Sequence, residues 1–136
     1  MPTILVVDDN RAIREFCRDE FEEDGYRVLL AGDGLEACQQ VRREQPDLVI
    51  LDISMPEMDG LAVIEQLRFL APEMPVVFFT SYDDACTLDA RGPLATACVE
   101  KSEDLSELKH VVGTALAARR LGQPYRLGLP PVLEAV

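Results

Sequence analysis

Four short apolar runs of the chain each end in polar residues whose side chains could do chemistry. These residues are Asp8 and Asp9, Asp52, Thr80 and Lys101, so they offer three carboxylates, one hydroxyl and one ammonium group. Carboxylates gathered at one place repel each other unless a cation lies among them. An oxygen-only ligand set without His or Cys suits a hard cation, Mg²⁺ above all. The pattern therefore predicts a magnesium site.

The same set of residues fits phosphoryl transfer. A carboxylate can act as a nucleophile and form an aspartyl-phosphate. Mg²⁺ and Lys101 would neutralise the charge on the transferring phosphoryl group, and Thr80 would offer a neutral donor to one of its oxygens. The sequence contains neither the GxxxxGK[ST] loop nor the GxGxxG loop that serve other phosphate chemistries.

Each of these residues also has an ordinary structural interpretation when it is taken alone. Asp8, Asp9 and Asn10 can cap a helix, and Asp52 can belong to a turn. Thr80 can be a plain strand residue, and Lys101 can be a solvated charge. Only the set favours a common site, because independent roles would not require every residue to fall at one edge of a sheet.

The elements that must position these residues alternate regularly between strands and helices. Apolar runs of four or five residues are typical of strands buried on both faces of a sheet. Helical patterns separate them, including a weak one over 83–91, which makes five strand–helix units and predicts an α/β fold with a parallel sheet. Ligands of such sheets bind beyond the carboxyl ends of the strands. The five predicted strands are 4–7, 28–31, 48–51, 76–79 and 97–100.

Two helix starts can be read from the sequence. Asp33 followed by Glu36 is a variant of the capping box and predicts a helix from residue 34. Ser102 is predicted to cap the last helix. The buried face predicted for the helix after Asp33 consists of Leu35, Cys38 and Val41.

Length and composition limit the classes of function. A chain of 136 residues is about one domain, since domains average about 150 residues. The hydrophobic share of 48% predicts a globular protein, and the net charge of −12 argues against binding to nucleic acid or to an anionic membrane. The chain has neither a signal-peptide pattern nor an apolar run of membrane-spanning length.

The four cysteines are interpreted as small buried hydrophobic residues. None forms a CxxC pair, and the chain has a single histidine, so a structural zinc site is not expected. Free thiols are typical of a reducing compartment, and we therefore expect a cytoplasmic protein. The cysteines are Cys17, Cys38, Cys86 and Cys98.

Five parts of the chain together form a longer pattern: ILVVDDN from residue 4, DGLEA from 33, PDLVILDISMPEMDG from 46, PVVFFTS from 75, and Lys101. With these segments the chain resembles, from residue 3 to about residue 121, the receiver domain of bacterial two-component response regulators. The resemblance implies a flavodoxin-like, doubly wound five-stranded parallel sheet of order 2-1-3-4-5 with five helices. It also implies a receiver domain over 1–121, followed by a tail or linker over 122–136.

The resemblance also implies roles for the site residues. Asp52 would accept a phosphoryl group from a histidine kinase or a phosphotransfer protein. Asp8 and Asp9 would hold Mg²⁺ together with Asp52 and the main-chain carbonyl of Ser54. Lys101 would contact the phosphoryl group. The chain would transfer the group onto itself and hydrolyse it slowly, without being a turnover enzyme.

In such a receiver Thr80 would turn toward the phosphorylated aspartate and move the loop that follows. This sequence departs from the family in two places, with Cys98 where an aromatic residue is usual and Ser102 where proline is usual. We therefore expect a trans peptide before Ser102. Phosphorylation is expected to act through the backbone of 81–93, with Tyr82 as the mobile aromatic side chain.

The expected output is binding to a downstream effector protein. Two other functions remain open from the sequence. One is a docking module that is never phosphorylated, and the other is a metal-dependent phosphatase, which would usually need an aspartate where Ser54 stands. The chain can also be the receiver part of a longer regulator.

Overall fold

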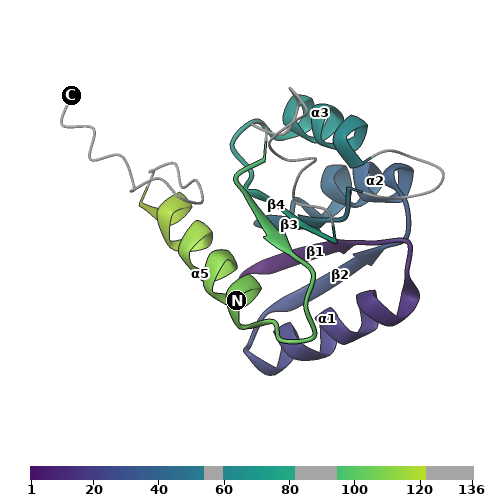
Figure 1. Ribbon diagram of the computed structural model, residues 1–136. Helices are drawn as coiled ribbons and strands as arrows, with labels where there is room; N and C mark the ends of the chain where they lie inside the picture. Colours follow the sequence, from purple (N-terminus) through teal and green to yellow (C-terminus); the bar gives the residue numbers. More distant parts are fainter. Residues whose placement is uncertain (54–59, 82–94, 122–136) are drawn as a thin grey trace.

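The computed structural model describes residues 1–53, 60–81 and 95–121. Strands and helices alternate along the chain as the apolar pattern predicts (Figure 1). Four helices lie in the described residues, and the helix predicted over 83–91 lies outside them. The elements are β1 (Thr3–Val7), α1 (Arg11–Glu23), β2 (Arg27–Ala31), α2 (Gly34–Glu44), β3 (Leu48–Leu51), α3 (Gly60–Leu70), β4 (Val76–Thr80), β5 (Ala97–Glu100) and α5 (Ser106–Arg120).

The five strands form one parallel sheet of order β2-β1-β3-β4-β5. This is the doubly wound, flavodoxin-like order that the sequence implies, so that prediction is confirmed. The register brings the strand ends together, because Val7 of β1 pairs with both Ala31 of β2 and Leu51 of β3. The residues after Val7 and Leu51 therefore leave the sheet at the same edge.

The core lies in two layers, one on each face of the sheet. Helices α2 and α3 cover one face, and α1 and α5 cover the other (Figure 1). Strand β1 serves both layers, since Leu5 packs toward α2 and α3 whereas Ile4 packs toward α1 and α5. All five residues of β1 are buried, as expected for a strand covered on both faces.

The predicted buried face of α2 is wrong at one residue. Cys38 and Val41 are buried, but Leu35 is 64% exposed, and Ala37 takes its place against the sheet. The cause is the entry of the helix, because Gly34 is the buried first residue and Leu35 beside it faces away. The apolar residues of this helix do not by themselves show which side of it faces the sheet.

The predicted cap of the last helix is also wrong. Helix α5 begins at Ser106, and its N-cap residue Leu105 makes no side-chain cap bond. Ser102 instead accepts a hydrogen bond from the Asp104 main chain, and Asp104 accepts one from Ser106. Ser102 is therefore used in the turn that precedes the helix, and the N-cap residue Leu105 is buried. The described residues include no cis peptide bond, which confirms the trans peptide before Ser102.

The cysteines only partly follow the prediction. Cys17 and Cys38 are free and buried, whereas Cys98 is half-buried and disulfide-bonded. A free thiol at Cys98 was therefore a wrong prediction, because the apolar pattern along a strand carries no information about which sulfur lies near it in space. Cys86 lies outside the described residues. None of the helices in the described ranges is long and apolar enough to cross a membrane.

Candidate functional site

The turn between β1 and α1 supplies the first residues of the site. Asn10 is the N-cap of α1, where its side-chain oxygen accepts hydrogen bonds from the main chains of Ala12 and Ile13. The Asp8 carboxylate accepts a hydrogen bond from the Asn10 main chain at 2.9 Å. The capping alternative is thus right for Asn10. Asp8 itself turns back toward the sheet edge, where it is 2% exposed.

Two further strand ends bring in the remaining charged groups. The Asp52 main chain donates to the carbonyl of Val7 at 3.0 Å, which ties the end of β3 to the end of β1. The Lys101 main chain donates to the carbonyl of Thr80 at 2.8 Å, which ties the end of β5 to β4. Strand pairing therefore delivers both side chains to the edge that carries Asp8.

Asp8, Asp9 and Asp52 come together as predicted. One carboxylate oxygen from each lies within 4.8 Å of the other two. Asp8 and Asp52 are buried, whereas Asp9 is exposed, so the cluster has two fixed inner ligands and one open side. Three carboxylate oxygens at this spacing are a ligand set for a hard divalent cation, with waters free to complete the octahedron.

Lys101 bridges the two buried carboxylates. Its ammonium nitrogen lies 2.8 Å from Asp8 and 3.1 Å from Asp52. Burial raises the pKa of Asp8, although the hydrogen bonds from Lys101 and Asn10 oppose the shift. Burial lowers the pKa of Lys101, but its hydrogen bonds and charge interactions with Asp8 and Asp52 outweigh this, so the net shift is upward. Lys101 is therefore held as a cation.

Thr80 lies at the same edge, completely buried as the last residue of β4 and paired with Glu100 of β5. Of the residues assigned to switching, Cys98 lies on β5 opposite Phe78. Ser54, expected to supply a main-chain carbonyl to the metal, and Tyr82 both lie outside the described residues.

One further residue lies at this edge that the sequence did not predict, Arg14 of α1. One of its guanidinium nitrogens, Nη1, donates a 2.7 Å hydrogen bond to the main-chain carbonyl of Asp8. Its position in the first turn of α1 gave no signal, because an arginine on a surface helix is usually a solvated charge. Only the spacing of six residues from Asp8, which is the reach of one long side chain over a helix start, could have suggested the contact.

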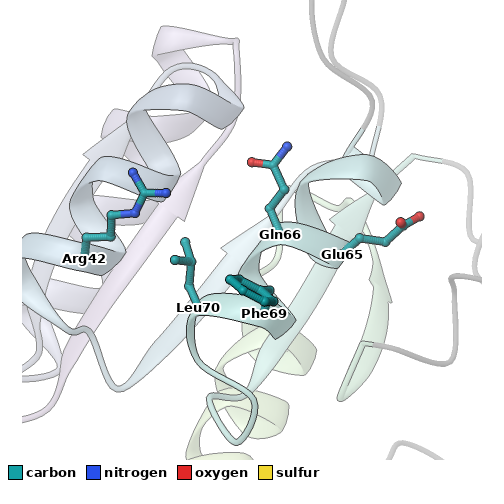
Figure 2. A pocket seen from close by; sticks show the side chains of 5 residues that line it. All are labelled: Arg42, Glu65, Gln66, Phe69 and Leu70. Carbon is teal, nitrogen blue, oxygen red and sulfur yellow. The ribbon is translucent and has the colours of Figure 1, made fainter.

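A separate pocket lies between α2 and α3 (Figure 2). Arg42 reaches into it from α2, and the other lining residues belong to α3. Arg42 and Leu70 are close to the carboxyl ends of their helices, so the pocket is at the opposite end of the sheet from the acidic cluster. None of its lining residues was predicted as a site residue. They are Arg42, Glu65, Gln66, Phe69 and Leu70.

Comparison with known proteins agrees with the geometry of the acidic edge. Residues 4–113 match the family model of the response regulator receiver domain. The response regulator MprA of Mycobacterium leprae is 46% identical over 80 residues, which cover 59% of this chain and 35% of that protein. MprA of Mycobacterium ulcerans is 45% identical over the same share of this chain and 34% of its own length. The match thus spans about a third of these longer relatives.

Solved structures show the same fold. The response regulator TrrA of Thermotoga maritima, in complex with Mg²⁺ and a beryllofluoride group, superposes with a TM-score of 0.80 at 37% identity, covering 84% of this chain and 98% of that one. TrrA in complex with the histidine kinase ThkA gives 0.78 at 37% identity, over 84% of this chain and 97% of that one. A receiver domain from Clostridium thermocellum gives 0.81 at 26% identity, over 89% and 98%. With its family match, sheet order and acidic edge in agreement, the chain belongs to the receiver domains of two-component response regulators.

Proposed function

We propose that this chain is a phosphorylation-switched receiver whose acceptor is Asp52. The observation that carries the proposal is the convergence of three carboxylates and one lysine at the carboxyl edge of the sheet. Asp8, Asp9 and Asp52 would hold Mg²⁺, with the Ser54 carbonyl as a further ligand. Bound there, Mg²⁺ would neutralise charge on the phosphoryl oxygens.

The donor is a phosphohistidine of a histidine kinase or of a phosphotransfer protein. An Asp52 carboxylate oxygen attacks the phosphorus, the phosphorus–nitrogen bond breaks, and the imidazole leaves with the electron pair and takes up a proton. Lys101, 3.1 Å from Asp52, would bind an oxygen of the arriving group. Water later attacks the acyl phosphate and releases inorganic phosphate, so the chain switches slowly and does not turn over an external substrate. The ThkA–TrrA complex supports a kinase as the partner.

The direct test is labelling by acetyl phosphate, read as added phosphate by mass spectrometry of the intact chain. Wild type should be labelled only with Mg²⁺, and Asp52→Asn should abolish labelling. Asp47→Asn is the matched control, because Asp47 stands at the other end of β3, where its carboxylate accepts a hydrogen bond from the Thr3 main chain. A wild-type chain that stays unlabelled with Mg²⁺ would instead be a docking module.

The output of the switch is expected in the segment that follows β4. The Thr80 hydroxyl would move toward phosphorylated Asp52 and shift the backbone of 81–93, with Tyr82 as the mobile aromatic residue. Cys98, a half-buried cysteine where the family usually has an aromatic residue, cannot sweep a comparable volume. The signal would then pass to a downstream effector protein.

Beryllofluoride mimics the phosphoryl group and allows this output to be measured by NMR. Chemical-shift changes should concentrate in 81–93, and Thr80→Ala should remove most of them. Cys98→Tyr should keep phosphorylation but alter effector binding. Cys98→Ser is its control, because that variant also breaks the disulfide but adds no ring. Changes confined to α1 and α2 would contradict the mechanism.

We further propose that the receiver occupies 1–121 and that 122–136 is a tail or linker, either of this protein or within a longer regulator. The net charge of −12 supports a protein partner over nucleic acid or an anionic membrane. A cytoplasmic location follows from the proposed donor. It no longer follows from the thiols, since Cys98 is disulfide-bonded.

A further inference from the structure

Strand β2 brings no polar side chain to the carboxyl edge of the sheet, where the acidic cluster lies. Strand β2 ends at Ala31, and the next residue is Gly32. Arg14 lies over this glycine. A Cβ atom added to Gly32 would stand 3.3 Å from Nη1 of Arg14 and 3.7 Å from its Cζ. The absence of a side chain at the end of β2 thus leaves the space that the guanidinium occupies.

The guanidinium uses this place to bind main chain. Its Nη1 donates to the Asp8 carbonyl at 2.7 Å, a short distance typical of a charge-assisted hydrogen bond. Within the described ranges, Arg14 makes no ion pair with any carboxylate, although Asp8 belongs to the acidic cluster. The arginine therefore holds the turn and leaves the carboxylate oxygens to other partners.

Beside its ion pair with Lys101, Asp8 has three further supports, of which the bond from Arg14 is one. The Asp8 main-chain nitrogen donates to Ala31 of β2 at 3.2 Å. Its carboxylate accepts from the Asn10 main chain at 2.9 Å, and its carbonyl accepts from Arg14. Arg14 is the only one of these three supports that comes from a side chain, so a substitution can remove it without cutting the main-chain ladder.

We propose that Arg14, seated on Gly32, is a positioning residue of the metal site. It fixes the Asp8 main chain so that the buried Asp8 carboxylate keeps the orientation in which it binds a divalent cation. This inference rests on the proposed Mg²⁺ site. A guanidinium near a cation also repels it, and the proposal requires orientation to outweigh this repulsion. If orientation dominates, removing the arginine weakens Mg²⁺ binding; if repulsion dominates, removing it strengthens Mg²⁺ binding.

The experiment is calorimetric titration of the full chain with Mg²⁺. Arg14→Met keeps the apolar stem but removes the donor and the charge, and it should weaken Mg²⁺ binding about tenfold, as partners of metal ligands commonly do. Arg14→Lys keeps a donor and should recover part of the loss. At saturating Mg²⁺ the labelling rate with acetyl phosphate should be close to that of wild type, so that only the Mg²⁺ concentration for half-maximal rate increases.

Gly32 gives a second route that leaves Arg14 in the chain. Gly32 is not among the positive-φ residues, so a side chain there causes no backbone strain and acts through the space over the glycine. Gly32→Val should displace the guanidinium and weaken Mg²⁺ binding, and Gly32→Ala should do so less. In the Arg14→Met background Gly32→Val should add little. Arg11→Met is the matched control on the same helix, because Arg11 is exposed and pairs with Glu15.

The Mg²⁺ affinities of wild type and the variants separate the possible outcomes. Unchanged or tighter Mg²⁺ binding by Arg14→Met would overturn the inference while leaving the proposed function standing. Equal loss in Arg11→Met would overturn it as well, because the effect would then be general electrostatics. Failure of the wild-type chain to bind Mg²⁺ would overturn both the proposed function and this inference. Thermal unfolding followed by circular dichroism shows that each variant is folded.

Discussion

Lys101 neutralises charge before any cation arrives. Its ammonium group contacts both buried carboxylates, Asp8 at 2.8 Å and Asp52 at 3.1 Å, and its own side chain is 18% exposed. Two buried carboxylates without a neighbouring cation would strongly destabilise the fold. The lysine that would bind the phosphoryl group is therefore also a structural counter-ion, and the two roles can be separated by measurement.

Replacing Lys101 with methionine should cost about 2–4 kcal/mol in the free energy of unfolding without Mg²⁺, because it removes the cation that both buried carboxylates contact. Saturating Mg²⁺ should restore much of the loss by taking over the charge. Urea unfolding with and without Mg²⁺ measures both values. Lys109→Met is the control, since Lys109 pairs at a more open site with Glu20 and Asp24 and should change stability by less than about 1 kcal/mol. An equal, Mg²⁺-independent loss in both variants would contradict this account.

The raised pKa of Lys101 predicts a loss of stability in alkali. The folded state holds this proton more tightly than the unfolded chain, in which the ordinary pKa is 10.5. The stabilisation is therefore complete below pH 10.5 and is lost as the pH rises through the folded-state pKa. Without Mg²⁺, wild type should lose stability above that pH more steeply than Lys101→Met. Lys109 also has a raised pKa, but it is present in both proteins and contributes equally to both. Parallel curves of stability against pH would show that the contacts of Lys101 with Asp8 and Asp52 do not couple to folding.

At the scale of the element, α2 ends in a strained residue. Gln45 is its C-cap, with φ of 48° and ψ of 62°, and it is the one described residue other than glycine with positive φ. The left-handed conformation costs an L-residue with a side chain about 1–2 kcal/mol, and glycine escapes this cost. The helix therefore carries a local penalty that a single substitution can remove.

Gln45→Gly should raise the free energy of unfolding by about 0.5–1 kcal/mol, after the extra freedom of glycine in the unfolded chain is counted. Gln39→Gly is the matched control, because this exposed glutamine lies inside α2, where glycine should cost about 1 kcal/mol. Urea unfolding with an unchanged m-value would measure both. Destabilisation by both variants would mean that the bend at Gln45 is not strained.

The elements were predictable because apolar runs and helix caps are local signals. The bounds of β3 and β5, and the cap at Asp33, follow directly from their residues. Parallel strands then place Asp52 and Lys101 at one edge without further information. Arg14 was not predictable, since its role depends on the empty space over Gly32, and that space exists only after β2 lies beside β1.

At the scale of the whole molecule, salt can stabilise the fold in two ways. Any salt screens the repulsion within a chain of net charge −12, whereas Mg²⁺ can also bind at the acidic site. Mg²⁺ that binds only the folded chain should stabilise it by about 2.7 kcal/mol at one hundred times its dissociation constant. The measurement is the melting temperature against Mg²⁺ concentration, with NaCl adjusted to constant ionic strength so that general screening stays equal. Asp8→Asn should abolish the rise, and Asp47→Asn should keep it. A rise that NaCl alone reproduces would show screening without a site.

The separation of the site residues along the chain has a consequence for the newborn protein. Ribosomes deliver a chain from its N-terminus, so Asp8 and Asp52 emerge first, and Lys101 follows 49 positions after Asp52. During that interval a nascent chain holds the carboxylates of β1 and β3 but not the cation that neutralises them. If Asp52 is the acceptor, as proposed, a nascent chain would gain its full phosphoryl-binding site only when β5 pairs with β4 and brings Lys101 to the sheet edge.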